Sequence, residues 1–192
     1  MCKLIVSLSV FCGVVGCVNS NPSLYTLQPA SLQKISSYPS DVRIGVHEVR
    51  LPDYARDVRL AARQKDGSIV HLEEHRWADY PTRAVTRVLA INLRELTDRP
   101  VFGEPWPASF QPTLSVAVEF FEMDATRAGE MRFRGQFVLQ QHSSDVEPRV
   151  ESFEISSRVS GDSFNDVMQD IANALAELAS RIASSTGSTR DG

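Results

Sequence analysis

Alternation of apolar and polar side chains recurs in the stretch from residue 114 to residue 159. Three segments within it place large apolar residues at alternate positions. These residues are Leu114, Val116, Val118 and Phe120 in the first segment, Met131, Phe133, Phe137 and Leu139 in the second, and Phe153, Ile155 and Val159 in the third. A period of two is typical of strands with one buried and one wet face, and short gaps between them favour antiparallel pairing. The sequence therefore predicts a three-stranded antiparallel meander.

Two other segments repeat their apolar residues with the 3.6-residue period of an amphipathic helix. The first spans residues 81–97, where Pro81 is tolerated in the first turn because its missing N–H would be unpaired there. The second begins after Asp162 and Ser163, whose short polar side chains can accept the free N–H groups of a first turn. The apolar stripes are Val85, Val88, Leu89, Leu93 and Leu96 in the first helix, and Phe164, Val167, Met168, Ile171, Leu175, Leu178, Ala179 and Ile182 in the second. The predicted fold class is α+β, a mostly antiparallel sheet covered on one face by two amphipathic helices.

Further strands are predicted before the first helix. Residues 42–47 alternate as a half-buried strand does. The runs 58–64 and 69–75 flank Asp66 and Gly67, a pair that favours a tight hairpin because glycine accepts a positive φ. Both strands of this hairpin carry charge on both faces, so we expect it at the periphery of the sheet and not in the core.

The amino terminus has the pattern of an export signal. Lys3 precedes about a dozen apolar residues, too few to span a bilayer, which takes roughly 20. The run ends in Val14-Val15-Gly16-Cys17, which resembles the bacterial lipobox. In that motif the cysteine becomes the first mature residue and carries an S-diacylglycerol and an N-palmitoyl group. An ordinary cleaved signal, or an anchor helix with a cysteine there by chance, is the alternative.

These patterns divide the chain into a signal peptide (residues 1–16), a lipidated tether (17–24), one domain (25–184) and a disordered tail (185–192). Of the three cysteines only Cys17 would stay in the mature chain, so the domain must be stable without a disulfide. The net charge of −4 gives no basic field that would attract nucleic acid. We expect no nucleic-acid partner.

The sequence contains residues that could bind a metal or act in catalysis, but they do not form a metal-binding or catalytic motif. His71 and His75 lie four residues apart with Glu73 and Glu74 between them, yet the segment is strand-like, and a solvated strand face is favoured over a metal site. No motif brings two carboxylates together, and no nucleophile or phosphate-loop motif is found. We therefore expect no metal, no cofactor and no enzymatic activity.

Aromatic residues stand out in the proline-rich stretch 100–112. Phe102, Trp106 and Phe110 are candidates for contact with a partner, because exposed aromatic side chains can anchor an interface. The alternative is that they tuck into the loop itself. Trp77, just before the first helix, is expected in the core. The final helix lacks tryptophan and a lysine-rich polar face, which argues for core packing over a membrane-surface helix.

Several weak motifs follow Cys17 in a fixed order. They are Leu24-Tyr25-Thr26-Leu27, Ile44-Gly45-Val46 leading to Leu51-Pro52-Asp53-Tyr54, Arg76-Trp77-Ala78-Asp79, Arg87-Val88-Leu89, and a long Ala- and Leu-rich final helix. In this order they resemble the ABC-type transport auxiliary lipoproteins, the PqiC-like family. The chain departs from the family's usual Trp-Ala-Glu-Pro-Leu at Trp77-Ala78-Asp79-Tyr80-Pro81, so no role is carried over to Asp79.

The resemblance implies a non-enzymatic lipoprotein subunit of an MCE-type ABC transport system. Such a subunit would sit at the outer membrane, face the periplasm, support envelope integrity and dock a periplasmic MCE-domain protein. Val18, in place of an aspartate after the lipidated cysteine, agrees with outer-membrane sorting. Assembly into a homo-oligomer is implied by the resemblance alone. Two other hypotheses stay open: a periplasmic lipid-binding carrier, which needs a cavity between helices and sheet, and an enzyme, which needs a polar cleft.

Overall fold

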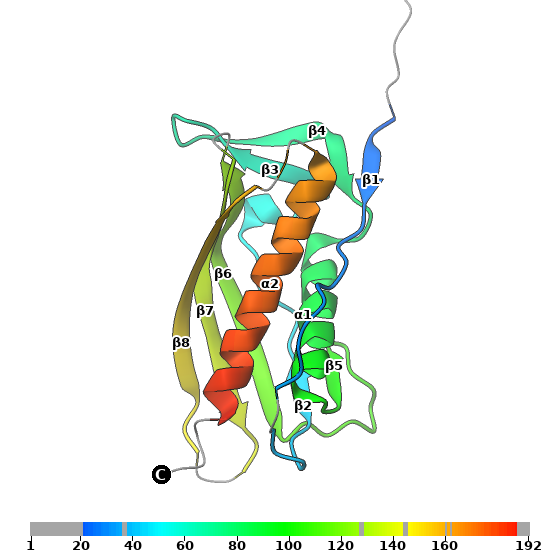
Figure 1. Cartoon of the computed structure of the whole chain (residues 1–192), viewed down its shortest axis with the longest axis vertical. Coiled ribbons are helices and arrows are strands. Elements are labelled where there is room, and N and C mark those ends of the chain that lie inside the picture. Colours follow the sequence, from blue (N-terminus) through cyan, green and yellow to red (C-terminus); the bar gives the residue numbers. More distant parts are fainter. Residues whose placement is uncertain are drawn as a thin grey trace, which may run out of the picture.

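The computed structural model describes residues 21–35, 38–126, 129–143, 146–159, 161 and 163–187. The chain forms one eight-stranded sheet and two long helices (Figure 1). The elements in chain order are β1 (Ser23–Tyr25), β2 (Ile44–Val46), the short 3-10 helix η1 (Asp53–Ala55), β3 (Arg59–Arg63), β4 (Ile69–Trp77), α1 (Pro81–Thr97), β5 (Val101–Gly103), β6 (Leu114–Thr126), β7 (Glu130–Gln141), β8 (Arg149–Arg158) and α2 (Phe164–Gly187). Within the described residues, no helix is long and apolar enough to cross a membrane. The predicted α+β class is confirmed.

Strand β6 organises the sheet. One of its edges pairs with β7, which pairs with β8, both antiparallel, as the alternation predicts. Its other edge is shared: the start of β6 pairs with β2 and its end with β3, both in parallel. β5 extends the sheet beyond β2 in parallel. Beyond β3, β4 is antiparallel and β1 pairs with β4 in parallel. The sheet is therefore mixed, with short parallel ladders that local sequence patterns do not predict.

Both helices lie on the same face of the sheet and contact each other (Figure 1). α1 begins at Pro81 and ends where Asp98 adopts a left-handed conformation with φ 53°, its N–H donating to the carbonyl of Arg94 at 2.9 Å. The apolar stripes of both helices are buried in one core with the inward side chains of β6, β7 and β8. α2 runs through Gly187, so residues 185–187, expected in the tail, are helical.

The hairpin of β3 and β4 forms where it is predicted, but the peripheral placement is wrong for β3, whereas β4 is mostly exposed or half-buried. β3 lies between β4 and β6, and Leu60, Ala61 and Ala62 are buried. The charged residues of β3, Arg59 and Arg63, are at the strand ends, where their long side chains reach carboxylates. Arg63 donates to the buried carboxylate of Asp124 at 2.6 and 3.2 Å, and the Tyr54 hydroxyl donates to the same group at 3.0 Å. A charged residue can therefore end a core strand when its charge is paired.

Gly135 allows two core rings to meet across an intervening strand. It pairs with Phe120 of β6 on one side and Phe153 of β8 on the other. The two rings are edge-to-face with centroids 5.3 Å apart. A Cβ on Gly135 would lie 2.1 Å from the carbonyl oxygen of Glu119 and 2.8 Å from Cζ of Phe153. Any side chain here would force backbone and ring to move.

Replacing Gly135 tests this packing. We expect Gly135→Ala to lower the free energy of unfolding by about 3 kcal/mol, the upper end for overpacking a core, because the closest atom is backbone. Urea unfolding followed by circular dichroism measures the change. Ser152→Ala, an exposed position on β8, is the matched control and should change stability by less than about 0.5 kcal/mol. Equal stability of wild type and Gly135→Ala would contradict the packing argument.

Candidate functional site

Phe102, Trp106 and Phe110 come together with His47 in one aromatic cluster. The ring centroids of Phe102 and Phe110 are 4.7 Å apart, those of Trp106 and Phe110 6.4 Å, and those of His47 and Trp106 5.0 Å. Phe102 belongs to β5, and Trp106 and Phe110 to the loop that joins β5 to β6. Phe102 is 41% exposed, while Trp106 and Phe110 are half-buried. The three rings pack on one another, as the alternative predicts, and Phe102 also reaches the surface; contact with a partner stays a prediction.

Gly45 provides the seat for Trp106. It pairs with Phe102 across β2 and β5, and a Cβ at Gly45 would lie 2.6 Å from Cζ3 of the indole. The indole therefore rests directly on strand backbone. Gly103 follows Phe102 in β5 and packs on α1, since its Cβ position would lie 3.1 Å from Cγ2 of Thr86. Because successive strand residues face opposite sides, Phe102 and the cluster lie on the sheet face that the helices leave uncovered.

A carboxylate holds the loop beneath the cluster. Glu104 accepts a hydrogen bond from the backbone N–H of Glu48 at 3.0 Å and contacts Nδ1 of His47 at 3.3 Å. The Glu48 N–H, and to a lesser degree His47, hold the pKa of Glu104 below its ordinary value. Sequence reasoning missed Gly45, His47 and Glu104. A glycine inside an alternating strand was the available signal, since it often marks a close approach of another group.

His71 and His75 serve separate structural roles. Nε2 of His71 lies 3.0 Å from the carbonyl oxygen of Tyr54, whereas the ring of His75 stacks on Phe164 of α2 with centroids 4.5 Å apart. No group of three or more metal-ligating side chains occurs in the described ranges. Trp77 is buried, as expected of a core residue.

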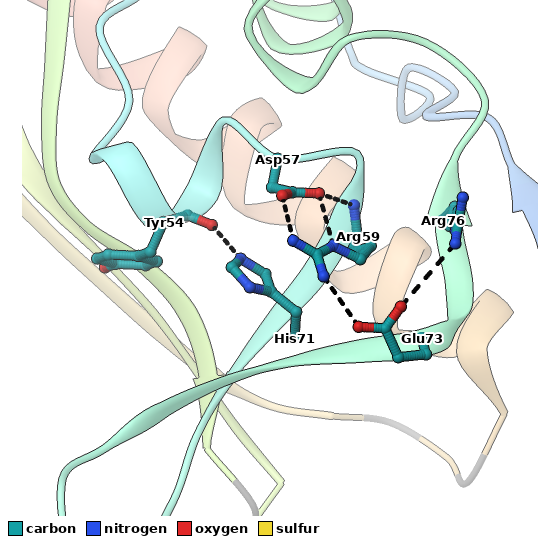
Figure 2. A network of polar contacts seen from close by, with 6 residues as sticks. All are labelled: Tyr54, Asp57, Arg59, His71, Glu73 and Arg76. Atoms are coloured by element: carbon teal, nitrogen blue, oxygen red, sulfur yellow. Dashed lines mark hydrogen bonds and ion pairs between the residues drawn. The ribbon is translucent and has the colours of Figure 1, made fainter.

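Figure 2 shows the polar network around His71, at the corner of η1, β3 and β4. Arg59 donates to both carboxylate oxygens of Asp57, at 3.0 and 2.7 Å, and to Glu73 at 2.9 Å. Arg76 lies 3.9 Å from the other oxygen of Glu73. The hydrogen bonds from Arg59 hold the pKa of Asp57 far below its ordinary value. These carboxylates are tied to guanidinium groups, which suits a structural clamp better than proton transfer.

Space between the helices and the sheet is small. The cavity found there, about 20 Å³, is lined by Leu60, Trp77, Met123, Met131, Val167 and Ile171 among others. That volume is about what one water needs. An acyl chain would require the helices to move away from the sheet, so the described residues do not favour the carrier hypothesis.

Cys17 lies outside the described residues. The described chain enters the sheet through β1, at the end of the domain where α2 begins and the β3–β4 hairpin lies (Figure 1). β2 and β5, which carry the aromatic cluster, lie toward the opposite end of the domain (Figure 1).

The contact between Trp106 and Gly45 can be tested by adding a side chain at position 45. In Gly45→Val the indole must leave the strand, so we expect iodide to quench the tryptophan fluorescence more strongly than in wild type. Trp77 is buried and contributes little to this change. The control is Trp106→Phe in the Gly45→Val background, which should remove the iodide-sensitive part of the emission. Unchanged quenching in Gly45→Val would show that the indole does not rest on Gly45.

The Asp57–Arg59 pair predicts a pH dependence. Because the folded pKa of Asp57 is depressed, its stabilising effect is fully present above the ordinary carboxyl range near pH 4 and is lost as the pH falls through the folded pKa. We expect wild type to lose more stability than Asp57→Asn as the pH falls below about 4, measured by urea unfolding at successive pH values. Parallel curves for the two proteins would count against a depressed pKa, and Asp53→Asn serves as the control.

Comparison with known proteins adds an independent finding. Residues 25–183 match the model of the family described as "ABC-type transport auxiliary lipoprotein component". A crystal structure of an uncharacterized protein is similar with a TM-score of 0.71 and 16% identity, covering 86% of this chain and 98% of its own. Protein XCC0632 from Xanthomonas campestris, of family DUF330, is similar with a TM-score of 0.66 and 13% identity, covering 83% and 92%. A search of curated proteins finds no significant match. Since the family model spans most of the chain, this protein belongs to the ABC-type transport auxiliary lipoprotein family.

Proposed function

We propose that this protein is the outer-membrane docking subunit of an MCE-type intermembrane lipid transport system. Lipid on Cys17 would fix one end of the domain to the membrane, and the aromatic cluster would contact a periplasmic MCE-domain protein and so support envelope integrity. The observation that carries the proposal is the separation of β1 from the aromatic cluster along the domain (Figure 1). A tethered docking protein needs its contact surface away from its anchor.

The tether is short. Cys17 precedes Ser23, the first residue of β1, by six residues, and an extended chain covers at most about 22 Å over that length. The β1 end of the domain would therefore stay close to the bilayer. The aromatic cluster would then face the periplasm.

The aromatic cluster has the features of an interface anchor. Its rings are held on strand backbone by Gly45 and by the Glu104 contacts, so little conformational freedom would be lost on binding. Phe102 presents an exposed ring beside a half-buried tryptophan, and aromatic side chains in such settings dominate binding energy. Homo-oligomer formation is part of the proposal, and it rests on the family alone.

The docking role is preferred to the two alternatives on specific grounds. A lipid carrier would need far more room than the 20 Å³ between α2 and the sheet. An enzyme would need free polar groups in a cleft. The network of Figure 2 instead binds its carboxylates in hydrogen bonds and ion pairs.

Affinity purification from detergent-solubilised envelopes tests the proposal. We expect wild type to co-purify an MCE-domain protein, identified by mass spectrometry. Trp106→Ser should reduce its recovery about 30-fold or more, as loss of a hot-spot side chain does. Phe121→Ser removes another exposed aromatic ring, on β6 outside the cluster, and should leave recovery unchanged.

Membrane fractionation of a Cys17→Ser variant tests the lipid anchor. Cys17→Ser should give a folded protein that no longer fractionates with membranes. Recovery of Cys17→Ser in the membrane fraction would contradict the lipid anchor. Wild type without an MCE-domain protein would contradict the docking role.

A further inference from the structure

A groove runs between α1 and the edge strand β5. Its volume is about 610 Å³. The helix side is formed by Arg83, Arg87, Ile91 and Arg94, and the strand side by residues 101–105. We call it the arginine groove. It lies beside the aromatic cluster, since Phe102 belongs to both.

The edge of β5 that faces away from β2 has unused backbone groups. Pro100 accepts a hydrogen bond from Ile44 at 2.9 Å, and Glu104 donates to Val46 at 2.8 Å. In a parallel ladder, alternate residues of a strand direct their backbone groups to the same neighbouring strand. The backbone N–H and C=O of Phe102, which lies between Pro100 and Glu104 in this alternation, therefore also point to β2. Val101 and Gly103 therefore direct their N–H and C=O groups to the other side, where no strand within the described ranges pairs with β5.

The groove floor is apolar and close to the helix. Gly103 packs against Thr86 and Ala90, with its Cβ position 3.1 Å from Cγ2 of Thr86 and 3.6 Å from Cβ of Ala90. The absence of a side chain at Gly103 favours this approach, which brings β5 alongside α1. An edge strand beside a helix is the geometry in which peptide-binding domains accept an added strand.

Charge is distributed unevenly along the groove. α1 and β5 are consecutive and joined by residues 98–100, so they run antiparallel and Arg94 lies toward the Val101 end. The side chain of Arg94 is exposed, and its guanidinium makes no hydrogen bond or ion pair with the described part of the chain. Arg87 is engaged by Asp79 at 3.1 Å and by the carbonyl of Leu27 at 3.3 Å.

The other end of the groove is more balanced. Arg83 lies over the ring of Tyr80, 5.8 Å from its centroid. Glu48 and Glu104 also line this end, and Glu104 is bound to the Glu48 N–H at 3.0 Å. The free cation is therefore at the Val101 end, where an incoming carboxylate would meet Arg94.

We propose that the arginine groove binds an extended, acidic segment of a partner protein, which adds to β5 as a further strand. Its backbone pairs with the edge of β5 at Gly103, which is more open than the buried Val101. Its apolar side chains lie on Ile91, and a carboxylate pairs with Arg94. Pro100 and Pro105 bracket the free edge, so the added ladder is short and the side-chain contacts supply the specificity. The inference deepens the proposed docking role by naming the kind of segment that is docked.

A synthetic probe tests the groove directly. The full-length protein, extracted in detergent, is titrated with a fluorescent hexapeptide of alternating glutamate and valine. We expect binding by anisotropy, and slower hydrogen exchange of residues 100–104 by mass spectrometry. Arg94→Glu should weaken binding about tenfold or more, the effect of losing one charge-assisted hydrogen bond. Arg158→Glu, the same charge change at an exposed position on β8, should leave binding unchanged.

Two matched peptides separate strand addition from simple charge attraction. A peptide N-methylated at alternate residues, which cannot complete the ladder, should lose binding, and so should a lysine–valine peptide. The proposal is overturned if the intact protein does not bind the acidic peptide. It is also overturned if either control peptide binds equally well, or if phosphatidylglycerol vesicles protect residues 100–104 in place of the peptide.

The groove proposal and the docking proposal can be refuted independently of each other. If Arg94→Glu still co-purifies the MCE-domain protein at wild-type levels, the arginine groove is not the docking element, and the docking role stands on the aromatic cluster. If wild type co-purifies no such protein, the docking role fails, while the peptide titration still decides whether the groove accepts an acidic strand.

Discussion

One edge of β6 holds the domain together. It hydrogen-bonds to β2 at its start and to β3 at its end, so two separate parts of the chain are fixed by the same thirteen-residue strand. Between them, an isolated bridge joins Arg50 to Glu119. β5 depends on β2, and β4 and β1 depend on β3. The aromatic cluster and the polar corner of Figure 2 therefore have fixed positions relative to each other because both are attached to β6.

Three glycines, which have no side chain, allow other groups to approach the sheet closely. Gly45 leaves room for the indole of Trp106 on one face of the sheet, and Gly103 leaves room for α1 on the other. Gly135 does the same within the core, where the rings of Phe120 and Phe153 meet across it. Each of these glycines faces a bulky group, and each has a neighbour within 3.1 Å of the Cβ position. The close approach of elements, more than backbone flexibility, explains them.

The sequence pattern predicted the elements that depend on residues close together in the chain. The helix at 81–97 follows from its apolar stripe and Pro81, and the meander of β6, β7 and β8 follows from the alternation within each of its three segments. The parallel ladders of β2 and β3 with β6 could not be predicted, because each joins only two or three residues from distant parts of the chain. The burial of β3 was missed because Arg63 looks exposed until its partner Asp124 is known. For the same reason the aromatic residues were predicted as a set, while Gly45, His47 and Glu104, which place them, were not.

The sharing of β6 also determines when the domain can begin to form on a chain that emerges amino-terminus first. β2 and β3 cannot join one sheet until residues 114–126, which pair with both of them, have appeared. β3 and β4 can make a two-stranded hairpin before then, but such a hairpin is marginal in water. More than half of the sequence therefore precedes the strand to which β2 and β3 are attached. A central strand that comes late in the chain makes the assembly of the whole sheet depend on the carboxy-terminal half of the sequence.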